Sequence, residues 1–202
     1  MIKYPSKTFF TADTHFDHAG ILRHCKRPFA DVKEMNEVLM QRWNYMVKPG
    51  STVYIIGDFA FKNHAWFLHR LNGKKILIEG NHDKMSVEVK NLFREVHPFL
   101  RRRFNGKDVT LCNYSMNTWA SSVHGAWHLY GHSHGRLKEG DSLSFDVGTD
   151  MWDYTPVPLE LVEYKMKIIE AALEKKYMMD FSHVNAKLNE HIKSTFILGG
   201  SK

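Results

Sequence analysis

The stretch Thr8-Phe9-Phe10-Thr11-Ala12-Asp13-Thr14-His15 decides much of how this chain folds. It is a short apolar run, typical of a buried β-strand, that ends in an Asp-x-His motif. Further along the chain, other apolar runs lead into polar side chains that can bind metal ions. These segments are Gly57-Asp58, Gly80-Asn81-His82-Asp83 and Gly131-His132-Ser133-His134. Because ligands bind at the carboxyl ends of strands in open α/β sheets, the four segments predict one shared site.

Between these segments the chain alternates strand-like and helix-like patterns, which predicts an α/β fold. Strands are expected at residues 8–12, 53–56, 76–79, 109–112, 128–130 and 143–147. Helices are expected at residues 31–46, 63–71, 86–93, 158–177 and 182–196. The first of these helices begins with a capping box, in which Asp31 precedes Glu34 by three residues.

Bulk composition indicates one globular domain over residues 1–202, with a helical extension from about 158 to 202. That extension is expected either to pack on the sheet or to form an oligomer contact. The formal charge of +6 suits an anionic substrate. No apolar run is long enough for a membrane helix, no secretory signal begins the chain, and two cysteines suit free thiols. We therefore expect a cytoplasmic protein with no membrane partner.

The polar segments suit a binuclear metal site for phosphate ester hydrolysis. Two cations about 3.5–4 Å apart can bind phosphate oxygens and generate hydroxide from a bridging water. Such a pair needs a carboxylate between the ions, and Asp58 is the candidate because it stands alone behind a glycine. Asp13 and His15 lie two residues apart on one side of an extended chain, as do His132 and His134. Carboxylate, imidazole and amide ligands together favour Mn²⁺, Fe or Zn²⁺ over Ca²⁺.

From Thr8 to about Pro158 the order of motifs resembles the calcineurin-like metallophosphoesterases, and in particular their small single-domain bacterial and phage members. The shared pattern is D-x-H, G-D, G-N-H-D and G-H-x-H. The resemblance implies a four-layer α/β/β/α sandwich, two β-sheets face to face with helices outside. It also implies a hydrolase with two divalent ions, Mn²⁺ first, with Fe, Ni²⁺, Zn²⁺ or Mg²⁺ as alternatives.

The resemblance also assigns roles to individual residues. The first ion would take Asp13, His15, Asp58 and His134, and the second Asp58, Asn81 and His132. His82 would act as general acid or stabilise charge on the phosphate. Asp83 would hydrogen-bond the His82 ring and set its tautomer.

One position departs from the family pattern. The family supplies a lone histidine to the second ion, and here Asn113 stands in that place. Asparagine binds through its carbonyl oxygen, so the second ion should be looser or should be a harder cation such as Mn²⁺ or Mg²⁺. His124 and His128 lie nearby and could compensate, although His128 also fits the strand before Gly131.

Several other residues have two readings each. His18 could contact phosphate or act as a general acid, and Arg23 could contact phosphate. Both could instead be ordinary helix residues. Asn81 is expected to contact the substrate as well as the second ion. Residues 101–103, three arginines in a row, could form a solvated turn or bind phosphate. Asn117, Trp119 and Trp127 could line a pocket for a ring, or belong to the core.

The leading hypothesis is a two-metal phosphodiesterase acting on small nucleotide-like diesters. The second is a nuclease for single-stranded or nicked nucleic acid, encouraged by the basic charge. The third is a catalytically weakened scaffold of the same fold that binds partners, which the asparagine at position 113 would favour.

Overall fold

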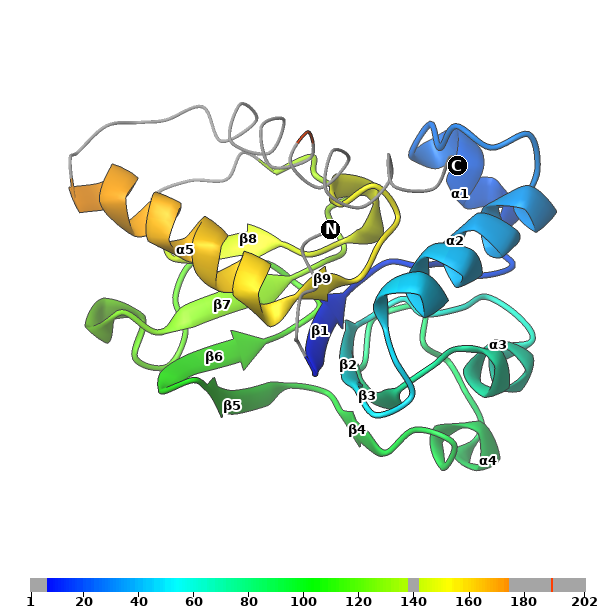
Figure 1. The fold of residues 1–202 in the computed structure, drawn as a ribbon, viewed down its shortest axis with the longest axis horizontal. Helices are drawn as coiled ribbons and strands as arrows, with labels where there is room; N and C mark the ends of the chain where they lie inside the picture. The colour runs from blue at the N-terminus through cyan, green and yellow to red at the C-terminus, as the bar shows by residue number, and fades with distance from the viewer. Residues whose placement is uncertain (1–6, 138–141, 175–189, 191–202) are drawn as a thin grey trace.

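The computed structural model describes residues 7–137, 142–174 and Glu190 (Figure 1). Its first sheet has five strands in the order β4-β3-β2-β1-β9. The strands are β1 (Thr8–Thr11), β2 (Thr52–Ile56), β3 (Lys74–Ile78), β4 (Glu95–His97) and β9 (Val157–Pro158). β1 to β4 pair in parallel, and β9 runs antiparallel to β1.

The second sheet has four strands in the order β5-β6-β7-β8. They are β5 (Leu100–Phe104), β6 (Lys107–Leu111), β7 (Trp127–Tyr130) and β8 (Ser144–Asp146). β6, β7 and β8 are parallel, whereas β5 joins β6 as an antiparallel hairpin. Each sheet therefore contains a block of parallel strands whose carboxyl ends lie at one edge.

The two faces of the first sheet bury different sets of side chains, because successive residues of a strand point to opposite sides. Phe9, Val53 and Ile55 face a cluster built with α1 (Ala19–His24), α2 (Val32–Met46) and α3 (His64–Arg70). Asp31 caps α2 as its side chain accepts a hydrogen bond from the Glu34 amide at 2.8 Å. In the expected capping box the Glu34 side chain would also accept a hydrogen bond from the Asp31 amide. Here it accepts that bond from the amide of the preceding residue, Ala30.

The opposite face of the first sheet packs against the second sheet. Phe10, Tyr54 and Ile56 share one buried cluster with Leu129 and Phe145. The helix α5 (Leu159–Glu174) adds five buried side chains to the same cluster and contacts β1 and β9. Figure 1 shows α5 on one side of the molecule and α1 to α3 on the other, with α4 (Val87–Lys90) near α3.

The α/β class is confirmed, and the two sheets with several helices are compatible with the expected sandwich. The helices α1, α2 and α3 cover the outer face of the first sheet, whereas α5 joins the cluster shared by the two sheets. Two 3₁₀ turns, Ser122–His124 and Thr149–Met151, belong to the second sheet's side. The six expected strands and the helices near residues 31, 63, 86 and 158 are present with shifted ends. The expected helix over 182–196 lies outside the described residues.

The expectation that the arginine run at 101–103 forms a turn is wrong, because the run forms the middle of β5. Arg101 and Arg103 bond the carboxylate of Asp108 across the hairpin. Arg102 bonds Glu95 and the Tyr54 hydroxyl. The alternation of half-buried and exposed positions along β5 explains why a charged run can be a strand.

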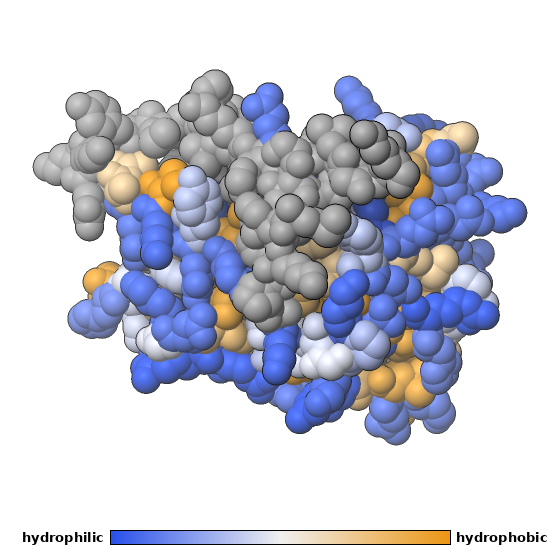
Figure 2. All heavy atoms as spheres, in the orientation of Figure 1, coloured by the Kyte–Doolittle hydropathy of each residue, from blue (hydrophilic) through white to orange (hydrophobic). Residues whose placement is uncertain are grey.

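Among the described residues, no helix is both long and apolar enough to cross a membrane. Figure 2 shows a face on which hydrophilic side chains dominate and hydrophobic ones form small separate patches. This distribution is ordinary for a folded domain in contact with water.

Candidate metal centre

The site lies where the parallel strands of both sheets end. Asp13, Asp58 and Asn81 follow β1, β2 and β3, and all three strands run in the same direction. On the second sheet, Asn113, His132 and Asp150 follow β6, β7 and β8. The two edges meet, because the amide of His132 donates hydrogen bonds to both carboxylate oxygens of Asp13, at 3.0 and 2.8 Å.

The backbone at these strand ends takes a conformation that L-residues seldom adopt. Asp13, His15, Asp58, His132 and His134 have φ values of 54°, 49°, 55°, 65° and 48°. Each such residue costs stability and persists only where its surroundings enforce it, which occurs mainly at functional sites. Their concentration in these loops marks the strand ends as more than connecting turns.

Close glycine packing helps to enforce that geometry around the carboxylate of Asp13. A Cβ atom at Gly131 or at Gly148 would lie 2.8 Å from its Oδ2, and a Cβ at Gly80 would collide with Asp58. The glycines of the sequence motifs are therefore needed so that the loops can approach the carboxylates closely.

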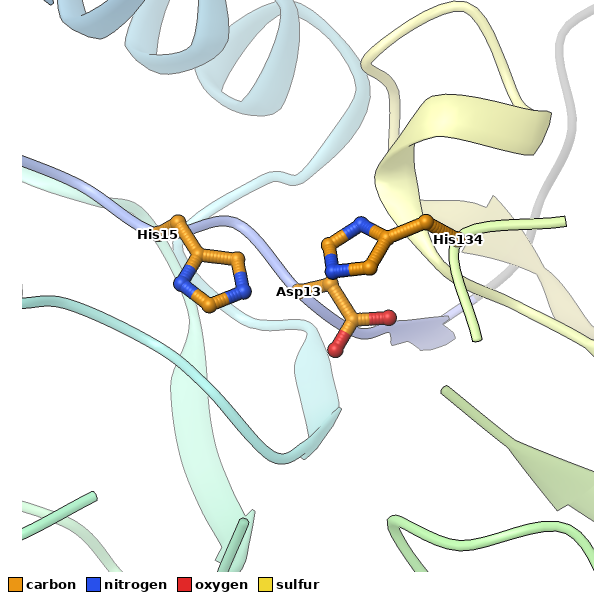
Figure 3. Close-up of side chains that lie close together, drawn as sticks. All are labelled: Asp13, His15 and His134. Carbon is orange, nitrogen blue, oxygen red and sulfur yellow. The ribbon is translucent and has the colours of Figure 1, made fainter. Parts of the chain in front are cut away.

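Three side chains form the compact centre of the site. Asp13, His15 and His134 each offer a possible ligand atom, and these atoms all lie within 4.8 Å of one another. Figure 3 shows the two imidazole rings next to each other, with the Asp13 carboxyl group beside them; the ring centroids lie 5.3 Å apart. Asp58 lies beside them, with its Oδ2 3.7 Å from Nε2 of His15. The structure thus brings together all four residues expected at the first ion.

His15 has the properties of a metal ligand. It is 2% exposed, and its Nε2 is buried without any hydrogen-bond partner. Burial, together with positive charge at His134 and Arg27, lowers the pKa of His15 to about 2. The ring is therefore neutral at physiological pH, and its unpaired Nε2 lies 3.7 Å from the carboxylate of Asp58. A divalent cation would satisfy this orphaned atom.

The buried carboxylate of Asp13 needs a nearby positive charge to be stable as an anion. Burial and the nearby Asp146 raise its pKa well above the usual value, although His134 and the His132 amide act in the opposite direction. Asp58 adds further repulsion. Buried carboxylates this close together are stable as anions only when a cation or several donors compensate them.

His134 is oriented by a carboxylate that the sequence reasoning missed. Its Nδ1 lies 2.7 Å from Asp150, which leaves Nε2 available to the group around Asp13. Burial favours a lower pKa for His134, but hydrogen bonds to Asp150 and Cys25 and the charge of Asp13 raise it to about 10. The signal for Asp150 was available, because Gly148-Thr149-Asp150 follows β8 as the other ligand segments follow their strands.

Arg27 is a second residue that the sequence did not reveal. Its guanidinium is buried and makes a two-point ion pair with Asp150, at 2.8 Å for each contact. It also donates to the backbone carbonyls of Asp13 and Thr14, at 2.7 and 3.0 Å. Arg27 therefore ties the Asp-x-His loop of the first sheet to the loop after β8 of the second.

Cys25, His134 and Asp150 also have possible ligand atoms within 4.8 Å of one another. Asp150 is already neutralised by Arg27, and Arg136 lies 3.8 Å from the Cys25 sulfur. Two guanidinium groups make this neighbouring position unfavourable for a cation. The group around Asp13 and His15 is the better metal centre.

Asp83 has contacts that differ from the expected ones. Its Oδ2 accepts the amides of Asp58 and Gly80, each at 2.8 Å, and its Oδ1 accepts the amide of Phe59 at 2.9 Å. The expected bond to the His82 ring is therefore not formed, because the backbone takes up both oxygens. Burial raises the pKa of Asp83 to about 6, with the amide bonds acting to lower it. Asp83 joins two motif loops and does not set a tautomer.

His82 and His18 lie at the mouth of the site. The His82 amide donates to Oδ1 of Asp58 at 2.9 Å, and its exposed ring lies 5.5 Å from that of His15 between centroids. His18 is half-buried, with its Nδ1 3.3 Å from Nδ1 of His15 and its ring 6.0 Å from that of His82. Arg23 is exposed on α1, and no contact links its side chain to these residues within the described structure.

The residues expected at the second ion differ in their exposure to solvent. Asn81 and His132 are exposed at the ends of β3 and β7. Asn113 is 1% exposed, and its amide nitrogen donates to the carbonyl of Ile56 at 3.0 Å. Its Oδ1 has no hydrogen-bond partner, so an unused oxygen ligand is buried beside the loop that carries Asp58.

The two histidines considered as substitutes for that position have other surroundings. His128 is fully buried in β7, where Nε2 accepts the amide of Met116 at 3.2 Å and Nδ1 donates to the carbonyl of Thr110 at 3.1 Å. His124 is exposed in the turn Ser122–His124. Neither is brought to the Asp58 loop by a contact of the described residues.

The suggested aromatic pocket wall is not formed by the tryptophans. Trp119 and Trp127 are 8% and 4% exposed and belong to the packing of the second sheet. Trp119 donates to the carbonyl of Ala126 at 3.0 Å and packs on His128. Asn117 is exposed in the same segment.

Comparisons with known proteins were made for the whole chain, and no family model matches it. A structure of the protein of unknown function AQ665 from Aquifex aeolicus aligns with a TM-score of 0.65 at 23% identity, covering 78% of this chain and 97% of that one. YfcE, a phosphoesterase from E. coli, aligns with a TM-score of 0.37 at 17% identity, over 70% of this chain and 77% of its own.

The sequence relationship is stronger for an archaeal protein. The uncharacterized protein MJ1445 of Methanocaldococcus jannaschii is 34% identical over 175 residues, which is 81% of this chain and 92% of that protein. The chain belongs to the family of MJ1445.

Proposed function

We propose that this protein is a metal-dependent phosphoesterase that prefers diesters, with small nucleotide-like compounds as substrates. Asp13, His15, Asp58 and His134 would hold one divalent ion. Asp58, Asn81, Asn113 and His132 would hold a second, with Asp58 shared between the two. The resemblance of the motif order to calcineurin-like metallophosphoesterases supports this assignment.

The observation that carries the proposal is the unpaired Nε2 of His15. It is buried 3.7 Å from the Asp58 carboxylate and within the group that includes Asp13 and His134. A structural histidine in such a place would donate or accept a hydrogen bond. The unused nitrogen among carboxylates fits a cation site, and the mixed nitrogen and oxygen donors suit Mn²⁺, with Fe, Ni²⁺, Zn²⁺ and Mg²⁺ as alternatives.

The bound ions would supply charge neutralisation for the phosphate and an activated water. The side chains of the chain itself would do the rest. His82 lies at the mouth with an exposed ring, from which a ring nitrogen can donate a proton to the leaving oxygen. His18, whose ring lies close to those of both His15 and His82, can hydrogen-bond a phosphate oxygen. Asp83 holds the loop of His82 against that of Asp58 through the main chain.

A small diester is favoured over nucleic acid because the arginine run is already paired. Asp108 bonds Arg101 and Arg103, and Glu95 bonds Arg102. The feature that encouraged a nuclease is therefore a set of ion pairs around a hairpin. The scaffold hypothesis is weakened by the buried, unsatisfied ligand atoms of His15 and Asn113, which a binding-only protein would not need.

The test is hydrolysis by metal-stripped protein of bis-p-nitrophenyl phosphate and p-nitrophenyl phosphate. Mn²⁺, Mg²⁺, Ni²⁺ and Zn²⁺ are each added back separately, and an Asp58→Asn variant purified in parallel controls for contaminating hydrolases. We expect metal-dependent turnover, with higher kcat/KM for the diester. Absence of turnover with every metal would refute the enzyme proposal, and a preference for the monoester would refute the diester assignment.

A further inference from the structure

Two exposed aromatic rings lie at the rim of the candidate metal centre, and the proposed chemistry uses neither. Phe61 is 48% exposed and Tyr114 is 49% exposed. Phe61 comes three residues after Asp58 on the side of the first sheet, and Tyr114 directly follows Asn113 on the side of the second. Aromatic side chains of this size are more often buried, so a pair at a polar site requires an explanation.

Phe61 is held firmly in its exposed position. Its amide donates to the carbonyl of Phe16 at 2.7 Å, next to a β-bridge between Phe16 and Ala60. Its ring stacks on the imidazole of His18, with centroids 4.6 Å apart and planes 13° from parallel. Because His18 covers one face of the ring, the opposite face is the one open to a ligand.

Tyr114 occupies a comparable position on the other sheet. Two residues further on, the Met116 amide donates to Nε2 of the buried His128 at 3.2 Å, which anchors the main chain of this segment. Its ring meets the imidazole of His132 edge to face, with centroids 4.7 Å apart. Each exposed aromatic ring thus packs on a histidine that was assigned to the site from the sequence.

Two other exposed aromatic residues, Trp66 and Tyr45, have partners of a different kind. Trp66 lies under the guanidinium of Arg70, 3.8 Å from its ring centroid, and Tyr45 lies near the ammonium of Lys48. Those contacts are local cation–π pairs on or beside one helix. Phe61 and Tyr114 differ because each exposed ring packs on a histidine at the edge of the candidate metal centre.

We propose that Phe61 and Tyr114 bind planar rings carried by the substrate, so that the substrate is a phosphodiester with at least one nucleobase. This inference rests on the proposed phosphoesterase function. His18 stands between the His15 ring, at 5.2 Å, and the Phe61 ring, at 4.6 Å. A phosphate at His15 and a base on Phe61 would be separated by this imidazole, just as a sugar separates them within a nucleotide. Stacking on aromatic side chains is the general way in which proteins bind bases without reading their sequence.

The test compares two substrates that differ only in the base: the methyl ester of adenosine 5′-phosphate and the methyl ester of ribose 5-phosphate. Hydrolysis is followed by ³¹P NMR with Mn²⁺ present, for wild type, Phe61→Leu and Tyr114→Leu. We expect wild type to prefer the adenosine ester in kcat/KM by about 10- to 100-fold, and the leucine variant at the ring that stacks on this single base, Phe61 by the geometry above, to lose most of that preference. Phe61→Trp should retain it, and Trp66→Leu is the matched control that should leave the preference unchanged.

Binding of adenosine 5′-phosphate and ribose 5-phosphate, measured by calorimetry with Mn²⁺, gives a second readout that needs no turnover. Equal hydrolysis of both esters by wild type, or an unchanged preference in both leucine variants, would overturn the aromatic site while leaving the phosphoesterase intact. Suppose that neither ester is hydrolysed, but that adenosine 5′-phosphate binds more tightly than ribose 5-phosphate and a leucine substitution removes the difference. The enzyme proposal then fails and the ring-binding site stands. Equal binding of the two monophosphates in that case would overturn the ring-binding site as well.

Discussion

The guanidinium of Arg27 forms a two-point ion pair with the carboxylate of Asp150, which lies 123 residues further along the chain. The same carboxylate accepts Nδ1 of His134, and the same guanidinium bonds the carbonyl of Asp13. One ion pair therefore positions parts of the candidate metal centre that come from both sheets. Its integrity should matter for folding even when no metal is bound.

Asp150→Ala should lower the free energy of unfolding by about 3–5 kcal/mol in the presence of a chelator, because it leaves the buried Arg27 guanidinium without its counter-charge. Urea denaturation followed by tryptophan fluorescence measures this loss. Asp153→Asn is the matched control, since it weakens a more exposed pair with Arg42 and should cost less than about 1 kcal/mol. Similar losses in both variants would show that the Arg27–Asp150 pair has no special structural role.

Metal binding should stabilise the fold, because a cation would compensate the buried carboxylates of Asp13 and Asp58 and pair with Nε2 of His15. At about 100 times its dissociation constant, one Mn²⁺ should add about 2.7 kcal/mol to the free energy of unfolding. Thermal denaturation of stripped protein, with and without Mn²⁺, measures the shift. Asp13→Asn should abolish most of the gain, whereas an equal gain in that variant would place the ion elsewhere.

Asp58→Asn should abolish activity and lower metal content at both positions, because the proposed bridging charge between two cations is lost. Metal content per chain is measured by mass spectrometry after equilibration with Mn²⁺ and removal of the free ion. The Asp108→Asn variant removes an aspartate of the β5–β6 hairpin and should keep the wild-type content. Two tightly held ions in Asp58→Asn would contradict the bridging assignment.

His82→Ala should retain both metal ions and lose activity by about 10²–10⁴-fold, the range for removal of a positioned general acid. The measurements are kcat for bis-p-nitrophenyl phosphate and metal content on the same preparation. His69→Ala, which removes a histidine near the end of α3, should leave both unchanged. Loss of an ion from His82→Ala would make His82 a ligand.

Sequence patterns were sufficient wherever neighbouring residues set the local structure. Apolar runs predict the strands that lead to Asp13 and Asp58, and a short-range hydrogen bond predicts the capped helix after Asp31. The structure confirms those elements. The parallel arrangement of β1, β2 and β3 then requires their ligand-bearing ends to share one edge. For this reason the sequence could place Asp13, His15 and Asp58 at one edge without coordinates, and the structure brings these side chains together.

Tertiary structure decided whatever depends on partners distant in the sequence. Arg27 looks like any loop arginine until Asp150 is seen beside it, and the oxygens of Asp83 are taken up by amides that no local motif identifies. The arginines of β5 read as a turn because their pairing with Asp108 arises only in the folded hairpin. Burial likewise separates Trp119 in the core from Phe61 at the rim, since solvent exposure depends on the packing of the whole chain and not on residue type.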